Sequence, residues 1–301
     1  MSTAPVGAER VPAPVTASSA SLVPAVSAAV SFSVADILLK VVYASGMNVL
    51  TLVTLRGLLV VAFFAAWLRI DPPMRWHTHR ERVVALGLGV LFAMTMFGLL
   101  QAIALLPVSI AILAYFIYPL LTGMGAAITG VERLGWRALL TAAVAFLALG
   151  LMLGQQITDL SRLGLVFAFG TALCRAVSLL LTRAMLSGTD ARVTTWYSMV
   201  PSTVIFVAAS VAVSEWQLPQ TGWGWGAFLG VSLTTTLSTL LIYISTNSIG
   251  AFRTALMMNL EPLLTLIFSL LLLREVLTPL QILGAGTMIG SLCAFQFVRP
   301  R

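Results

Sequence analysis

The chain contains ten apolar stretches of the length, about 20 residues, that an α-helix needs to cross the hydrocarbon core of a bilayer. These stretches are residues 22–43, 49–68, 83–105, 108–129, 135–154, 163–183, 194–214, 226–248, 251–273 and 278–298. Only 9% of the 301 residues are charged, whereas a soluble domain carries about 25%. A water-soluble fold could not hide this much apolar surface. The sequence therefore predicts an all-α polytopic membrane protein with ten transmembrane helices.

The segment before the first apolar stretch has a different composition. Residues 1–21 are mainly Ala, Pro, Ser, Thr and Val, without a periodic apolar face. Such a segment cannot bury enough surface to order itself, so we expect a disordered tail. It also lacks a basic region followed by a cleavage site, so we expect the first apolar stretch to remain as a membrane anchor.

The seventeen Lys and Arg residues are unevenly divided between the two sides of the membrane that the ten spans define. If the N-terminus is cytoplasmic, twelve lie in cytoplasmic segments, three lie inside spans, and only Arg162 and Arg274 lie in outer loops. Basic residues concentrate in cytoplasmic loops of membrane proteins. We therefore expect both termini in the cytoplasm. The net charge of +7 is a topology signal, and nucleic acid is not an expected partner.

The two halves of the sequence match when 143 is added to each residue number. Pro119–Thr122 (Pro-Leu-Leu-Thr) then falls on the identical Pro262–Thr265. The same offset places Glu132 on Glu275, Leu134 on Leu277 and Lys40 on Arg183. Agreement of a tetrapeptide with acidic and basic positions at one offset indicates an internal repeat.

This repeat divides the chain into two five-helix units, residues 22–158 and 159–301. Because each unit has an odd number of spans, the second unit enters the membrane from the opposite side. Inverted repeats of this kind let one fold open alternately to either side of a bilayer. The repeat therefore predicts a transporter.

Pro119 and Pro262 occupy the middle of the fourth and ninth spans. Each proline lacks a backbone N–H and clashes with the carbonyl four residues earlier, here that of Tyr115 or Met258. A carbonyl freed in this way must find a partner or line a wet cavity. We expect symmetry-related helix breaks at a shared central cavity, the alternative being kinks that only give shape.

Glu261 directly precedes Pro262 at the centre of the ninth span. A carboxylate in the membrane must be paired, protonated or solvated by a cavity. One interpretation is a proton-coupling or cation-binding site, and the other is a structural ion pair with Arg56 or Arg175. The repeat position of Glu261 is Tyr118, so any carboxylate chemistry belongs to the second unit alone.

Other charged residues inside spans have competing interpretations. Asp36 and Lys40 lie four residues apart on one helix and could pair with each other, or Asp36 could face a cavity. Arg56 and Arg175 could each bind a substrate carboxylate through two hydrogen bonds or could bond backbone carbonyls at a helix end. We favour the structural role for Arg56 and leave both roles open for Arg175.

Several uncharged polar side chains within the spans are candidate substrate contacts, although some will only join helices. The candidates are Gln101, Tyr115, Tyr118 and Asn259.

Signals of catalysis or metal binding are weak. The two histidines, His77 and His79, lie in an Arg-rich loop without Cys or paired carboxylates nearby, and Cys174 and Cys293 lie in apolar stretches. The chain has no glycine-rich phosphate loop, metalloprotease motif or nucleophile elbow. We therefore expect no enzymatic activity, no cofactor, no metal and no ATP-driven pumping within this chain.

Two segments carry a resemblance to a known family. Residues 111–150 include YFIYPLLTGMGAAITGVERLGWRALLTAAVAFLALG, and residues 259–295 are NLEPLLTLIFSLLLLREVLTPLQILGAGTMIGSLCAF. Each has a mid-helix proline, an apolar stretch, a glutamate near the next connection and a glycine-containing last helix. The chain resembles EamA-type transporters of the drug/metabolite transporter superfamily.

The resemblance implies two inverted EamA units around a cavity walled by spans one, three, four, six, eight and nine. It also implies structural roles for Glu132 and Glu275, and a bacterial inner-membrane carrier that exports amino acids, related metabolites or toxic compounds. We expect a secondary transporter of small polar or zwitterionic metabolites, in which Arg175 and Glu261 recognise opposite charges. Proton coupling would involve Glu261. The alternatives are a membrane receptor or assembly protein that retains the carrier fold, and an intramembrane enzyme.

Overall fold

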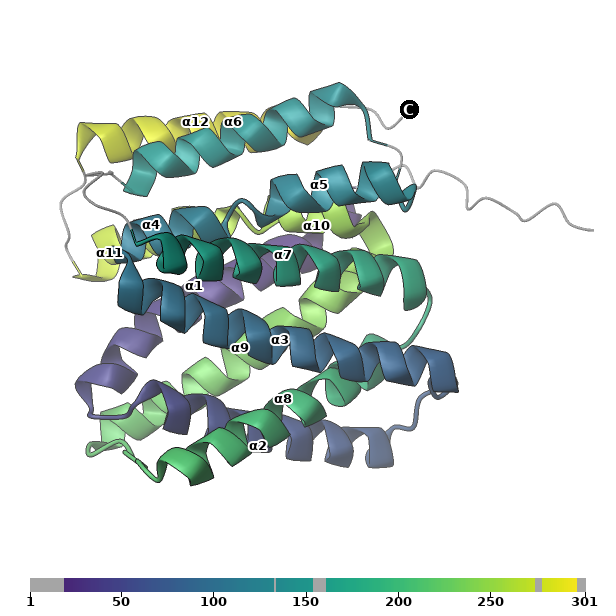
Figure 1. Ribbon diagram of the computed structural model, residues 1–301, viewed down its shortest axis with the longest axis vertical. Helices are drawn as coiled ribbons and strands as arrows, with labels where there is room; N and C mark the ends of the chain where they lie inside the picture. Colours follow the sequence, from purple (N-terminus) through teal and green to yellow (C-terminus); the bar gives the residue numbers. More distant parts are fainter. Residues whose placement is uncertain (1–18, 133, 154–160, 274–277, 297–301) are drawn as a thin grey trace, which may run out of the picture.

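The computed structural model describes residues 19–132, 134–153, 161–273 and 278–296, and these form a bundle of helices without a strand (Figure 1). The helices are η1 (Ser19–Leu22), α1 (Val23–Ala44), α2 (Val49–Ile70), α3 (His79–Leu105), α4 (Val108–Tyr115), α5 (Tyr118–Thr129), α6 (Trp136–Leu153), α7 (Arg162–Met185), α8 (Ala191–Val213), α9 (Gly222–Ile249), α10 (Ala251–Met257), α11 (Leu260–Leu273) and α12 (Pro279–Gln296).

The ten predicted spans coincide with this helix order, with α4 and α5 forming the fourth span and α10 and α11 the ninth. Within the described ranges, nine spans are long and apolar enough to cross a membrane, and α12 adds a shorter apolar helix, Pro279–Ala294. The predicted all-α polytopic membrane fold is confirmed. The predicted disordered tail lies outside the described residues except for Ser19–Ser21, which belong to η1.

Both predicted helix breaks are present. Phe116 and Ile117 separate α4 from α5, and Pro119 lies in the first turn of α5. The same arrangement recurs at the α10–α11 junction, where Pro262 lies in the first turn of α11. Proline is tolerated in a first turn because that N–H would have no helical partner. Each proline therefore lets a new helix begin inside the bundle.

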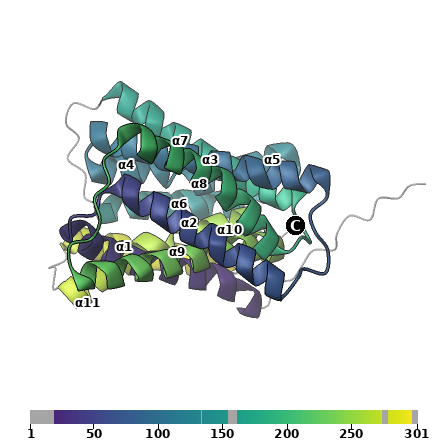
Figure 2. The same ribbon diagram turned by 90° about the horizontal axis from the view of Figure 1, so that it is seen from below.

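Helices of the two halves pack in pairs: α1 with α9, α3 with α7, α2 with α8, and α6 with α12. The α1–α9 and α3–α7 pairs lie on opposite sides of α2 and α8 in the view of Figure 2. Under the 143-residue offset, α1–α9 and α3–α7 exchange places, and the other two pairs map onto themselves. The pairing is what two inverted five-helix units predict.

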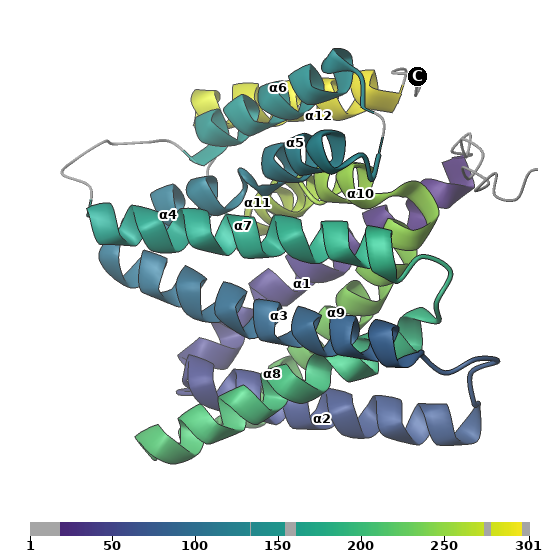
Figure 3. The same cartoon turned by 45° about the vertical axis from the view of Figure 1, so that its right-hand side comes forward.

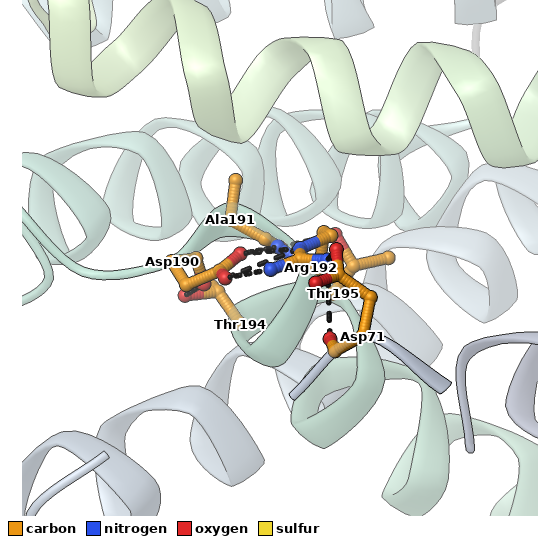
Figure 4. A network of polar contacts seen from close by, with 6 residues as sticks. All are labelled: Asp71, Asp190, Ala191, Arg192, Thr194 and Thr195. Carbon is orange, nitrogen blue, oxygen red and sulfur yellow. Dashed lines mark hydrogen bonds and ion pairs between the residues drawn. The ribbon is translucent and has the colours of Figure 1, made fainter. Parts of the chain in front are cut away.

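Hydrogen bonds near both ends of α2 and α8 show that these helices run antiparallel. At one end, Asn48 Nδ2 donates to the Glu215 carbonyl oxygen at 2.8 Å. At the other end, the Arg192 guanidinium lies 2.5 Å from the Asp71 carboxylate and 2.7 Å from that of Asp190 (Figure 4). We call the second end of the bundle the Arg192 end. The opposite end, where Trp223 lies in the first turn of α9, is the Trp223 end.

More polar contacts join the helices at the Arg192 end. His77 Nε2 lies 2.9 Å from Thr194 Oγ1, and the His77 ring packs against Tyr197, whose ring also contacts Arg82. Glu132 accepts hydrogen bonds from the backbone N–H groups of Ala251 and Phe252, which begin α10. These bonds stabilise the start of α10, as expected for an anion at a helix N-terminus. The structural role predicted for Glu132 is confirmed, whereas Glu275 lies outside the described residues.

The buried His77 predicts a pH effect on stability. Burial lowers the pKa of His77 below its ordinary value of 6.5, so the folded protein favours the neutral ring. The stabilisation is complete above the unfolded pKa and is lost as the pH falls from there through the folded pKa. We expect the melting temperature of the purified protein to fall between about pH 7 and pH 5, near where histidine titrates.

The variant His77→Gln should flatten this pH profile, because glutamine retains a hydrogen-bonding group but does not titrate. The matched control is His79→Gln, two residues away on the exposed start of α3. Equal pH profiles for wild type and His77→Gln would contradict this role for His77.

Candidate functional site

The helix pairs enclose a cavity of about 820 Å³. Its lining comes from α1, α2, α3, α4, α5, α7, α8, α9 and α11. The resemblance predicted walls from α1, α3, α4–α5, α7, α9 and α10–α11, and all of these except α10 contribute. Sequence reasoning missed the contributions of α2 and α8. The volume lies within the range of about 300–1,000 Å³ that is usual for small-molecule sites.

Four charged side chains line the cavity: Asp36 on α1, Arg56 on α2, Arg175 on α7 and Glu261 on α11. Two are acidic and two are basic, so the lining is electrically balanced when all four are ionised. Within the described residues, no ion pair of 4.0 Å or less is found for any of them, whereas such pairs occur at the Arg192 end. The charges are therefore separated around the cavity and are available to a ligand that carries both signs.

Arg175 is held beside the first helix break by two tyrosines. Its guanidinium carbon lies 5.9 Å from the centre of the Tyr118 ring, and the Tyr115 and Tyr118 rings lie 5.3 Å apart. Arg175 Nε is buried and has no hydrogen-bond partner. A buried donor without a partner carries an energetic cost that a bound acceptor can remove. Arg175 is therefore suited to bind an anionic group in the cavity.

Glu261 occupies the first turn of α11, directly after the second helix break. The partial positive charge of a helix N-terminus favours a carboxylate at this position. The Glu261 carboxylate attracts the guanidinium of Arg175 and repels the carboxylate of Asp36. Asp36 Oδ2 in turn accepts a hydrogen bond from Thr265 Oγ1 at 2.8 Å, which links α1 to α11. An ammonium group could bind between the two carboxylates and reduce their repulsion.

The structure brings most of the predicted site residues together. Asp36, Tyr115, Tyr118, Arg175 and Glu261 all line the cavity. Three of these residues lie beside the helix breaks at Pro119 and Pro262. Tyr115 and Tyr118 flank the first break, and Glu261 follows the second.

Other predictions about single residues fit less well. Gln101 is absent from the cavity lining, and so is Asn259, which is buried with an unpartnered Oδ1 at the second break. Arg56, for which the sequence favoured a structural role, is among the cavity-lining residues. Asp36 bonds Thr265 from the other half of the chain, a partner that the Asp36–Lys40 hypothesis did not include.

Sequence reasoning also overlooked polar residues on α7 and α9 that line the cavity. Ser178 and Thr182 lie on the same face of α7 as Arg175, and Thr235 and Thr239 lie four residues apart on α9. Tyr243, four residues further along α9, also lines the cavity and was already a candidate polar residue from the sequence. Residues spaced by three or four share one helix face. This spacing was a usable signal, because a polar stripe on a membrane helix is expected to face a cavity or a neighbouring helix. Within the described ranges, no group of three or more His, Cys, Asp or Glu residues could hold a metal.

Comparison with known proteins supports the predicted resemblance. Residues 162–295 match the model of the EamA-like transporter family. The second half of the chain carries an EamA domain. The chain is also 27% identical over 265 residues to the threonine/homoserine exporter RhtA of Escherichia coli strain K12, a match that covers 86% of this chain and 84% of RhtA. RhtA of Escherichia coli O157:H7 matches to the same extent.

The fold of this chain is also found in a solved crystal structure. That structure superposes with a TM-score of 0.78 and covers 92% of this chain and 96% of its own, at 15% sequence identity. At this identity the likeness concerns the fold alone. The EamA domain and the RhtA match confirm the resemblance to the drug/metabolite transporter superfamily. Together with the apolar helices, they support a multi-pass membrane protein that transports a small metabolite.

Proposed function

We propose that this protein is a secondary transporter that exports small zwitterionic metabolites, such as amino acids, across the bacterial inner membrane by alternating access. The observation that carries the proposal is the central cavity, in which Arg175 with its unpartnered Nε and the carboxylates of Glu261 and Asp36 come from different helices. An α-amino acid presents a carboxylate and an ammonium group that match these two signs. Charge-assisted hydrogen bonds of this kind are stronger than those between neutral groups.

The position of the cavity supports a carrier that is closed on one side. Its lining uses mainly the second half of α3 and the first half of α2, both of which lie toward the Trp223 end. The ion pairs of Arg192 and the contacts of His77 join the helices at the opposite end. The basic loops place the Arg192 end in the cytoplasm under our topology, with both termini on that side. The cavity then lies on the outer side, and the inverted repeat supplies a related state on the inner side.

Glu261 is our candidate for proton coupling. A carboxylate that is alternately protonated and ionised can bind the substrate ammonium group in one state and release it in the other. The neighbouring carboxylate of Asp36 repels Glu261, and a shared proton or a bound ammonium group relieves this repulsion. RhtA, whose name gives threonine and homoserine as its substrates, offers a precedent among relatives for a zwitterionic substrate.

A flux assay tests the proposal. The purified protein, reconstituted in proteoliposomes, should exchange radiolabelled amino acids in a saturable manner, and the initial rate should depend on the pH gradient. Glu261→Gln removes the titrating group while nearly preserving its shape, so we expect exchange to persist but to lose its response to the pH gradient. Glu215→Gln, in the α8–α9 loop, is the matched control and should keep this response.

Two results would count against these proposals in different ways. Absence of flux for every amino acid and common metabolite, with a folded protein, would favour the receptor or assembly alternative. Wild-type flux by Glu261→Gln under every pH gradient would remove Glu261 from coupling but leave the transport proposal intact.

A further inference from the structure

The cavity has two chemically different walls. The charged and hydroxyl-bearing residues come from α1, α4–α5, α7, α9 and α11 and, through Arg56, from α2. The side chains that α3 and α8 contribute are apolar with one exception. That exception is Thr95, whose Oγ1 already donates a hydrogen bond to the Leu91 carbonyl oxygen at 2.8 Å. The wall formed by α3 and α8 therefore offers a ligand almost no polar partner.

Side chains of α2, α3 and α8 pack together to form one continuous apolar surface on this side of the cavity. Val53 of α2, Ala93 of α3 and Phe206 of α8 form a buried cluster, and Phe92 and Met96 of α3 pack against it. All five side chains also line the cavity. We call these five residues the apolar wall. A ligand group that rests on the apolar wall leaves water without gaining a hydrogen bond, so the wall favours hydrocarbon.

The arrangement of α3 and α8 leaves room beside the apolar wall. The two helices are in close contact at Gly89, where an added Cβ would lie 2.0 Å from the Ser198 carbonyl oxygen. From there they spread apart toward the Trp223 end (Figure 3). The part of α3 that lines the cavity runs from Leu88 to Ile103.

We propose that the substrate is a zwitterion with a bulky apolar side chain, such as a branched aliphatic or aromatic amino acid. This inference rests on the proposed function and specifies its substrate class. The charged head group binds Arg175 and Glu261, and the side chain rests on the apolar wall. Small hydroxylated amino acids such as threonine and homoserine would occupy only the polar side of the cavity. The apolar wall offers their hydroxyl groups no hydrogen-bond partner.

A binding panel that keeps the head group constant isolates the contribution of the side chain. The detergent-purified full-length protein is titrated with leucine, phenylalanine, threonine and homoserine by calorimetry. Burial of a leucine or phenylalanine side chain is expected to strengthen binding by about tenfold or more relative to threonine. The same order should hold when the four compounds compete for radiolabelled exchange in proteoliposomes.

Substitutions in the apolar wall should narrow this preference. Val53→Thr is nearly isosteric and places a hydroxyl group on the wall, and Phe206→Leu shortens it. Both variants should reduce the ratio of leucine to threonine affinity by about threefold or more, as expected for a lost hydrophobic contact. Phe169→Leu is the matched control for Phe206→Leu, because Phe169 lies on the exposed face of α7, outside the cavity lining. The control should preserve the wild-type ratio.

The outcomes separate this inference from the proposed function. If threonine and homoserine bind as tightly as leucine and phenylalanine, the apolar-substrate inference is wrong, and amino acid transport stands. If none of the four binds or is exchanged by the folded protein, both proposals are overturned. A strong leucine preference that neither wall variant changes would also overturn the assignment of the apolar wall.

Discussion

Arg175→Gln should weaken substrate binding by about 100-fold, which corresponds to about 2.7 kcal/mol. The guanidinium is the buried cation beside the Tyr115–Tyr118 pair, and its Nε lacks a partner until a ligand arrives. Glutamine can donate hydrogen bonds but offers no charge and no planar fork for a carboxylate. Calorimetric titration of the purified variant with the best substrate found for the wild type measures this loss.

Two further variants show whether the effect of Arg175→Gln is local. Arg175→Lys keeps the charge but not the fork, so its affinity should lie between wild type and Arg175→Gln. Arg137→Gln removes a cation from α6 that contacts Trp136 and does not line the cavity, and it should bind substrate like the wild type. Unchanged affinity in a folded Arg175→Gln protein would show that Arg175 does not touch the substrate.

Gly89→Val should destabilise the protein by about 3 kcal/mol, at the upper end of overpacking effects. A Cβ at position 89 would meet the Ser198 carbonyl oxygen at 2.0 Å and the Pro201 ring at 2.5 Å. The first of these is a backbone atom of α8, which also packs against α2 and cannot withdraw without disturbing that pair. We expect a clearly lower melting temperature in detergent and a lower yield of folded protein.

Gly87→Val is the matched control, because a Cβ at position 87 has no neighbouring atom within 4 Å. Both variants place the same β-branched residue on α3, so they share any change in helix propensity and differ only in packing. Equal melting temperatures for the two variants would show that α3 and α8 are not in close contact at Gly89.

The sequence was sufficient to predict the spans and their interruptions. Each span must be apolar over about 20 residues wherever it lies in the bundle, so its position is encoded locally. The breaks before Pro119 and Pro262 are equally local, since a missing N–H interrupts a helix regardless of its neighbours. The same local reasoning predicts that Tyr115, Tyr118 and Glu261 lie beside a cavity, without any knowledge of helix contacts.

The sequence predicted less well which polar side chains line the cavity, because that depends on which face of each helix meets which neighbouring helix. Arg56 and Gln101 are both polar residues in largely apolar spans, yet Arg56 lines the cavity and Gln101 does not. In lipid, the apolar pattern does not distinguish a face that meets another helix from one that meets hydrocarbon, so it cannot orient a helix about its axis. The pairing of Asp36 with Thr265 across the two halves depends on the same unknown.

By itself, the sequence determined the ten helical segments, their breaks at two repeated prolines and the confinement of charge to a few intramembrane positions, because each follows from hydrogen bonding and solvation along one helix. Only the tertiary structure decided that Asp36, Arg56, Arg175 and Glu261 share one cavity and that α3 and α8 give it an apolar wall. Those features depend on the rotation and crossing of helices distant in sequence. Packing of small residues such as Gly89 against a neighbouring backbone fixes that geometry.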